Sequence, residues 1–213
     1  MDALQLWRLS TLAQKTVTAL ENHGFTASYM QDNSSALEYI LARIPDRATV
    51  GIGGSKTEKT LGIACALAAK NCVVHDHNQP GLSADDAVAA RYKQLTADFF
   101  VCGTNAVTVT GELMNRDAFG NRVAAMMFGP KTVFVVAGTN KIVRNLEEAE
   151  LRIKTIAAPM NNKKYELPNP CVTFGECIDC NNKTRSCNIT TIINRRPPLT
   201  DIHVLLINEP LGF

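Results

Sequence analysis

The stretch TVGIGGSKTEKTLG at residues 49–62 combines glycines with Ser, Lys and Thr at a spacing that suits a bound anion. It departs from the Walker A loop, because Ser55 stands where that loop needs a glycine, and from the dinucleotide fingerprint, because Lys56 replaces the third glycine. A tight glycine turn that opens a helix still presents unpaired N–H groups and the positive end of the helix dipole. We therefore predict an anion-binding loop made of Gly53, Gly54, Ser55, Lys56 and Thr57. The alternative is a plain strand-to-helix turn in which the glycines only permit positive φ.

The densest polar stretch is GTNAVTVTGELMNRDAFGNR, residues 103–122, directly after an apolar run. Open α/β sheets place ligands at the carboxyl ends of their strands, so these side chains are expected at a site. Arg122 would clamp a carboxylate or phosphate in bidentate fashion, and Glu112 or Asp117 would act as a general base. Asn105 and Asn121 complete the predicted catalytic set. The alternative is a hairpin whose Asn, Asp and Gly residues serve turns.

Four cysteines lie close together in PCVTFGECIDCNNKTRSC, separated by gaps of five, two and six residues. The central C-x-x-C pair suits either a tetrahedral zinc ion or one edge of an iron–sulfur cluster, because thiolates bind both. We predict one metal centre here, an iron–sulfur cluster in the first place and zinc as the alternative, with free or disulfide-linked thiols as the third possibility. The predicted ligands are Cys171, Cys177, Cys180 and Cys187.

The other cysteines and a histidine pair have simpler interpretations. Cys65, Cys72 and Cys102 stand in apolar surroundings and are predicted to be buried small hydrophobic residues. His75 and His77 flank an aspartate at a strand end, which makes a metal pair conceivable. Nothing nearby completes such a site, so we interpret them as ordinary strand-end histidines.

Charge and hydropathy narrow the classes of partner. Lys and Arg number 22 against 20 for Asp and Glu, so no electrostatic feature indicates nucleic acid or an anionic membrane. No apolar run has transmembrane length, and the first residues, MDALQLWRLS, lack a signal-peptide pattern. A cytoplasmic location is therefore expected. In a reducing compartment, clustered cysteines indicate metal or redox chemistry rather than structural disulfides.

The elements that must position these residues alternate along the chain. Apolar strand patterns occur at residues 24–30, 48–52, 72–76, 98–103, 132–138 and 202–208, with helical periodicity between most of them. Alternation of this kind predicts an α/β three-layer sandwich with a mainly parallel sheet. We expect a single domain, residues 1–213. Residues 159–189 form a Cys-rich, loop-rich C-terminal excursion that needs something else to order it.

The ordered set of motifs resembles a known family over nearly the whole chain. GIGGSKT, the polar stretch at 103–122, VAGTNKIV, RIKTIAAPMNN, the four-cysteine segment and NEPLGF together look like the LUD-domain family of lactate-utilisation proteins. This resemblance implies the fold shared by ribose-5-phosphate isomerase, glucosamine-6-phosphate isomerase and CoA transferases. In that superfamily a Gly-Ser-Thr loop after an early strand holds phosphate or a related anion, and residues 53–57 are the matching positions.

The same resemblance implies a role in growth on L-lactate, beside iron–sulfur oxidoreductase partners that oxidise lactate to pyruvate. We therefore expect an accessory or electron-transfer subunit that supports L-lactate or 2-hydroxyacid oxidation and binds a small anionic metabolite. One alternative is a stand-alone enzyme that acts on a phosphorylated sugar or acyl substrate through the anion loop and a carboxylate base. Another is a metal-stabilised sensor of an anionic metabolite. The oligomeric state, including a homo-oligomer, is left open.

Overall fold

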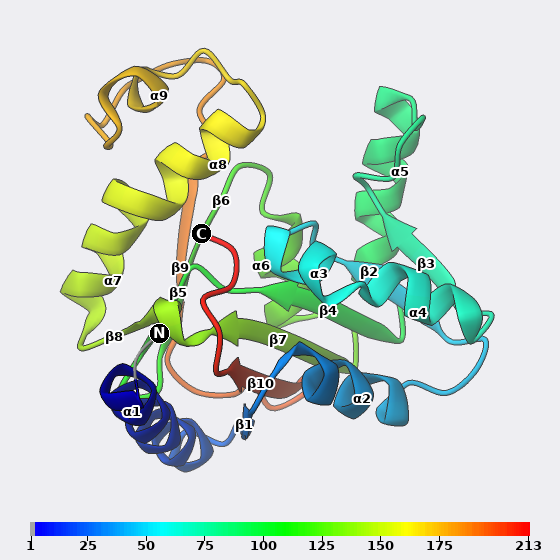
Figure 1. The fold of residues 1–213 in the computed structure, drawn as a ribbon. Coiled ribbons are helices and arrows are strands. Elements are labelled where there is room, and N and C mark those ends of the chain that lie inside the picture. The colour runs from blue at the N-terminus through cyan, green and yellow to red at the C-terminus, as the bar shows by residue number, and fades with distance from the viewer. Residues whose placement is uncertain (1–2) are drawn as a thin grey trace.

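The computed structural model describes residues 3–213, and its centre is a six-stranded sheet in the order β1-β10-β7-β4-β2-β3 (Figure 1). Every neighbouring pair in this sheet is parallel. The prediction of a mainly parallel sheet is therefore confirmed. The strands are β1 (Thr26–Met30), β2 (Thr49–Ile52), β3 (Val73–Asp76), β4 (Phe99–Gly103), β7 (Thr132–Gly138) and β10 (Asp201–Ile207).

Helices and a second sheet cover the two faces of this central sheet. One face packs against α2 (Asn33–Arg43), α3 (Lys56–Leu61) and α4 (Ile63–Ala69). The other face packs against α1 (Ala3–Asn22), α5 (Ala84–Leu95), α6 (Asn121–Met127) and strands of the smaller sheet. Alternate side chains of β7 serve both cores: Val133 and Val135 enter one, and Phe134 enters the other. Burial on both faces explains why these strands read as continuous apolar runs.

The smaller sheet was not foreseen as a separate layer. Its strand order is β8-β5-β6-β9, with β8 (Ile142–Val143), β5 (Ala106–Thr108), β6 (Leu113–Asp117) and β9 (Ile189–Ile193). Strands β5 and β6 pair antiparallel, so part of the polar stretch is the hairpin that the sequence left as an alternative. Strand β9 pairs with β6 from far along the chain. These long-range pairings place the polar stretch beside the main sheet.

A long helical rod replaces part of the expected loop-rich excursion. It consists of α7 (Leu146–Arg152), the π-helical turn η2 (Ile153–Ala157) and α8 (Ala158–Lys164), and the short α9 (Pro170–Phe174) follows. The expectation of a loop-rich excursion over residues 159–189 is therefore not confirmed for its first part, which is helical. The π turn has a bond from the Ala158 N–H to the Ile153 carbonyl, and such a turn accommodates a proline that would otherwise break the helix. The segment between α9 and β9, 175–188, contains no helix or strand.

Two further helix features bear on the sequence predictions. The single helix expected after the glycine loop is divided at Gly62, whose φ of 69° separates α3 from α4. The 20-residue α1 buries Ala13, Thr16 and Leu20 against the fold. Across residues 3–213, no helix combines the length and the apolar character that a membrane crossing requires.

Candidate functional site

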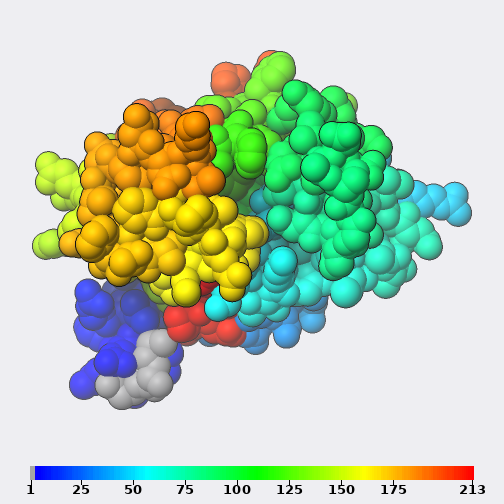
Figure 2. All heavy atoms as spheres, turned by 90° about the horizontal axis from the view of Figure 1, so that it is seen from above, coloured from blue at the N-terminus to red at the C-terminus, as the bar shows by residue number. Residues whose placement is uncertain are grey.

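A cleft of about 730 Å³ lies at the carboxyl ends of four strands of the main sheet. Residues that follow β2, β3, β4 and β7 form one wall: the glycine loop, His77 and Asn78, Thr104 and Asn105, and Lys141 in the short 3-10 helix η1 (Thr139–Lys141). The other wall is formed by the end of β6, the rod η2–α8, residues 183–186 and Asn188. Figure 2 shows the hollow between the yellow and orange atoms of this second wall and the blue-green helices opposite. This edge of the sheet, formed by the carboxyl ends of its strands, is the edge at which α/β proteins bind ligands.

The amides of the glycine loop already have partners inside the protein. The Gly53 N–H donates to the Val101 carbonyl at 2.9 Å, while the Gly54 and Ser55 N–H groups donate to Glu58 Oε2 at 2.6 and 3.0 Å. In return the Ser55 hydroxyl accepts the Glu58 N–H at 3.3 Å, which completes a capping box for α3. The prediction that an anion rests on the N–H groups from Gly53 to Ser55 therefore needs correction, because the chain's own carboxylate occupies that place.

Lys56 and Thr57, the remaining residues of the predicted loop, line the cleft at the start of α3. Gly54 is required for the close approach of the loop to the next strand end: its φ is 86°, and a Cβ there would lie 2.0 Å from Asn78 Nδ2. Gly54 thus acts as the alternative interpretation expects, because it permits the positive φ of the turn, and the amides of Gly53 and Gly54 bond within the fold.

Glu58 is the most unusual carboxylate of the site. It is 2 % exposed, and its Oε1 has no hydrogen-bond partner among the described residues. Burial raises the pKa of this carboxyl to about 7, although the donors from Ser55 and Gly54 and the charge of Arg122 oppose the rise. A group that changes its charge near neutral pH therefore lies directly beneath the loop.

Lys141 is buried beside Thr57 of the loop and lines the cleft. Its side chain is 3 % exposed, and Nζ donates to the Thr57 hydroxyl at 3.2 Å. Among residues 3–213, no carboxylate forms an ion pair with it. Burial, followed by the positive charges of Arg152 and Arg122, lowers the pKa of the Lys141 amine to about 7.

Arg152 is buried behind Lys141 and likewise has neutral partners. Its guanidinium donates from Nε to the Asn140 carbonyl at 3.1 Å and from Nη1 to the Asn105 carbonyl at 2.6 Å. Burial lowers the pKa of Arg152 to about 10. Two cations are therefore adjacent in the same desolvated region, which raises the local electrostatic potential.

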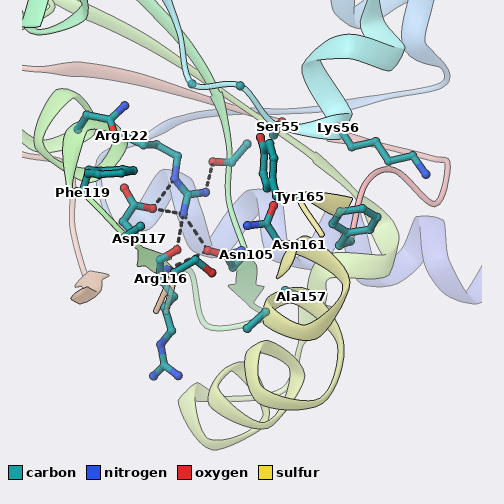
Figure 3. Close-up of a pocket in the computed structure, with 18 of the residues that line it drawn as sticks. Ser55, Lys56, Asn105, Arg116, Asp117, Phe119, Arg122, Ala157, Asn161 and Tyr165 are labelled. Atoms are coloured by element: carbon teal, nitrogen blue, oxygen red, sulfur yellow. Dashed lines mark hydrogen bonds and ion pairs between the residues drawn. The ribbon is translucent and has the colours of Figure 1, made fainter. Parts of the chain in front are cut away.

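Arg122 reaches the cleft, but internal acceptors occupy its donors (Figure 3). Nε and Nη2 donate to Asp117 Oδ1 at 2.9 and 2.5 Å, Nη1 donates to the Gly103 carbonyl at 3.1 Å, and Nη2 also reaches Asn105 Oδ1 at 2.9 Å. The predicted role of Arg122 as a clamp for a ligand acid is therefore corrected. The guanidinium instead joins the end of β4 to the end of β6.

The other predicted catalytic residues divide into two groups. Asp117, Asn105 and Asn121 line the cleft with Arg122, whereas Glu112 does not. The Asp117 carboxylate accepts from Arg122 and from the Val123 N–H, so its oxygens are committed to the fold. Asn105 Oδ1 accepts the Arg116 N–H at 2.9 Å, and Asn121 Nδ2 donates to Gln94 Oε1 at 3.1 Å.

Glu112 lies in the turn between β5 and β6. Its carboxylate accepts from the hydroxyls of Thr108 and Thr110, within the hairpin itself. The adjacent Gly111 carbonyl lies 3.1 Å from Nδ1 of His23, which follows the end of α1. The prediction of Glu112 as a general base is therefore corrected, because the hairpin turns this residue away from the cleft.

His77 lines the cleft, although its sequence context indicates an ordinary strand-end histidine, with a metal pair only as an alternative. Its Nδ1 lies 2.9 Å from Gln94 Nε2, and its Nε2 lies 3.2 Å from Asn78 Nδ2. Burial and the charge of Arg91 lower the pKa of His77 to about 4. The imidazole is therefore neutral at pH 7 and adds no charge to the cleft.

The four clustered cysteines are not gathered as a set of metal ligands in the described part of the chain. Throughout residues 3–213, no group of three or more His, Cys, Asp or Glu side chains is arranged to hold a metal ion. Buried Cys171 accepts from Asn162 Nδ2 at 3.1 Å, and Arg185 donates to the carbonyls of Cys180 and Cys187 at 2.8 and 3.4 Å. Hydrogen bonds from Asn162 and Arg185 thus reach three of the four cysteine residues. The iron–sulfur cluster, and zinc as its alternative, stay predictions without support from this geometry.

The three scattered cysteines differ in burial. Cys102 is buried as predicted, and burial raises the pKa of its thiol well above the ordinary range. Cys72 is half-buried. Cys65 is exposed, so the prediction for that residue is wrong.

Sequence reasoning missed Glu58, Lys141 and Arg152. Lys141 lies in VAGTNKIV, directly after the apolar run that forms β7, so the rule that selected residues 103–122 also applies to it. Glu58 stands three residues after Ser55, which is the spacing of a capping box. Arg152 had no comparable signal, because its burial depends on the packing of α7.

These features define a three-layer α/β protein with a cationic cleft at the carboxyl edge of a parallel sheet. Residues 13–207 match the family model described as LUD domain, and the chain belongs to the LUD domain family. The resemblance of the sequence motifs to that family is confirmed.

Solved structures that match this chain include the following two. A DUF162 family protein from Deinococcus radiodurans matches with a TM-score of 0.51 and 13 % identity, over 93 % of this chain and 98 % of that chain. Ribose 5-phosphate isomerase from Plasmodium falciparum matches with a TM-score of 0.31 and 14 % identity, over 53 % of this chain and 52 % of that chain. A search of curated proteins gives no match. The first similarity shows a shared fold along nearly the full length of both chains.

Proposed function

We propose that the cleft binds a small anionic metabolite, and that through this binding the protein supports oxidation of L-lactate or a related 2-hydroxyacid. The observation that carries the proposal is the charge of the cleft. Within the described residues one acidic side chain, that of Asp117, lines the cleft, and it is paired with Arg122. Seven cationic side chains line it as well: Lys56, Arg91, Arg116, Arg122, Lys141, Lys183 and Arg185.

Among these side chains, Lys141 is the strongest evidence for a bound anion. Arg116 and Arg122 form ion pairs with Glu150 and Asp117, whereas the buried Lys141 has a hydroxyl as its hydrogen-bond acceptor. A buried charge without a counter-charge is unfavourable, and a ligand carboxylate or phosphate would relieve it. The anion is therefore expected beside Lys141 and the start of α3, and not on the amides of Gly54 and Ser55.

Membership in the LUD domain family supports lactate or another 2-hydroxyacid as the metabolic context. The expected electron-transfer role depends on the four clustered cysteines, and no cluster of metal ligands is present in the described residues. The proposal is therefore an accessory subunit that binds the metabolite and works beside iron–sulfur oxidoreductase partners. Electron transfer by this chain is not part of it.

A second candidate, a stand-alone enzyme for a phosphorylated sugar or acyl substrate, is favoured by the size of the cleft. Its volume of about 730 Å³ lies in the range of drug-sized ligand sites and exceeds the need of a three-carbon acid. Glu58 would be the candidate for proton transfer, because its Oε1 has no hydrogen-bond partner among the described residues, although it lies beneath the loop and does not itself line the cleft. Turnover of ribose 5-phosphate by the purified protein would favour this candidate.

Titration calorimetry with L-lactate, pyruvate, phosphate and ribose 5-phosphate tests the proposal. We expect Lys141→Met to weaken binding of the preferred anion about tenfold or more, because the buried counter-charge is lost. The matched control is Lys163→Met, which removes an exposed lysine outside the cleft and should leave the affinity unchanged. Equal affinities in both variants and the wild type would contradict the proposal, as would the absence of binding for all four anions.

A further inference from the structure

Lys141 has the surroundings of a nucleophilic amine as well as those of a charged ligand contact. The side chain emerges from η1 at the end of β7, and Nζ is held at 3.2 Å from the Thr57 hydroxyl. The backbone at Gly212 also approaches it, since a Cβ on that glycine would lie 3.3 Å from Nζ. Nζ is therefore held in one position while it lines the cleft.

The charges around Nζ disfavour its protonated form. Arg152 and Arg122 face it from α7 and α6, and Glu58 and Cys102 face it from α3 and β4. Burial and the two arginines lower the pKa of Lys141 to about 7, while Glu58 and Cys102 oppose this effect. Lysines become nucleophiles in proteins by this route, through desolvation and a neighbouring cation. An exposed lysine would keep its proton at the same pH.

We propose that Lys141 forms an imine with the carbonyl carbon of a small 2-oxo carboxylate bound in the cleft. This inference rests on the proposed function, because the cationic wall must first hold the carboxylate. The 2-oxo acid is the oxidised counterpart of a 2-hydroxyacid, so the same wall suits both. The imine distinguishes them, since a 2-hydroxyacid has no carbonyl at that carbon.

Imine formation needs neither an oxidant nor a reductant. The lone pair on Nζ forms a bond to the carbonyl carbon, and the π electrons of the C=O bond move to oxygen, which takes up a proton. The resulting carbinolamine loses its hydroxyl as water after a second protonation, and a C=N bond forms. The two amine protons are released in the process, so the net change is amine plus ketone to imine plus water.

Reductive trapping tests this inference on the full chain. Wild-type protein is incubated with pyruvate and sodium cyanoborohydride, which converts an imine to a stable secondary amine, and the modified residue is mapped by mass spectrometry of peptides. We expect one adduct, on Lys141, whose yield rises as pH rises through about 7. L-lactate in place of pyruvate should give none.

Variants separate the nucleophile from the charge. Lys141→Arg keeps the positive charge and should abolish the adduct, whereas Lys163→Arg, outside the cleft, should leave it intact. Circular dichroism checks the fold of each variant, and peptide mapping on the wild type stands whether or not Lys141→Arg folds.

The outcomes distinguish this inference from the proposed function. Pyruvate binding by calorimetry without an adduct on Lys141 overturns the imine and leaves the proposed function standing. Labelling spread evenly over exposed lysines also overturns it. Absence of binding for every anion overturns the proposed function itself.

Discussion

At the scale of single residues, Glu58 changes the meaning of the glycine motif. A loop of this composition suits an external anion, but the carboxylate three residues after Ser55 turns back and accepts the Gly54 and Ser55 N–H groups. The buried carboxyl then becomes part of the loop, with Oε1 unpartnered. The anion that the sequence pattern predicts is supplied by the chain itself at these two amides.

Glu58 should make the stability of the protein depend on pH. Burial raises the pKa of this carboxyl from 4.5 to about 7 in the folded state. Its stabilising contribution is therefore fully present below about pH 4.5 and is lost as pH rises through about 7. The corresponding free energy is about 3 kcal/mol at most.

We expect Glu58→Gln to remove this pH dependence, because the amide does not ionise. Urea unfolding of wild type and variant between pH 4 and pH 8 measures it. The control is Glu147→Gln, which changes an exposed carboxylate. A difference between wild type and Glu58→Gln that stays constant over this pH range would contradict a raised pKa.

At the scale of elements, two glycines that flank α3 have positive φ, but they differ in the space available for a side chain. Gly54 has a φ of 86° and is crowded by Asn78, whereas Gly62 has a φ of 69° with open space at the position of a Cβ. The strain of a side chain in this conformation costs about 1–2 kcal/mol at either position. Only the first position adds a steric clash.

Gly54→Ala should therefore destabilise the fold more than Gly62→Ala, which acts as a matched control for the backbone strain. We expect about 1 kcal/mol for Gly62→Ala and at least twice that for Gly54→Ala, measured by chemical denaturation. Asn78 and the loop must shift in the Gly54 variant, so anion affinity should also fall there and not in the Gly62 variant. Equal destabilisation of the two variants would show that the clash is relieved without cost.

At the scale of the whole molecule, Arg122 joins the two sheets. It extends from α6, and its donors reach Asp117 at the end of β6 and the Gly103 carbonyl at the end of β4 (Figure 3). The cleft lies against this junction. The guanidinium is thus a positioning group for both walls.

Arg122→Met should destabilise the protein by about 3–5 kcal/mol, because the largely buried Asp117 carboxylate loses its counter-charge. Arg122→Met combined with Asp117→Asn should recover part of the loss, since the unpaired charge is then absent. The control is the ion pair between the exposed Arg144 and the half-buried Glu148, and Arg144→Met should cost less than about 1 kcal/mol. Chemical denaturation measures all of these variants. A double variant less stable than Arg122→Met alone would contradict the explanation by charge.

The sequence by itself determined the main sheet and the edge at which the cleft lies. Strands such as β7 are buried on both faces and therefore read as continuous apolar runs, which local pattern reveals. The polar residues that follow β2 and β4 could be placed at one edge because parallel strands share a direction. The helix that the glycine turn opens was predicted as well, and its N-cap at Ser55 depends on residues close in sequence.

Only the tertiary structure decided which polar groups are free to meet a ligand. Arg122 and Asp117 read as functional groups, yet each finds its partner in the other once β6 and α6 are in place. Lys141 follows an apolar strand in the sequence, but its burial beside Arg152 and Thr57 depends on how η1, α7 and the distant start of α3 pack together. Hydrogen-bond satisfaction and desolvation are set by long-range packing, whereas the pattern of a sequence reports mainly on neighbours along the chain.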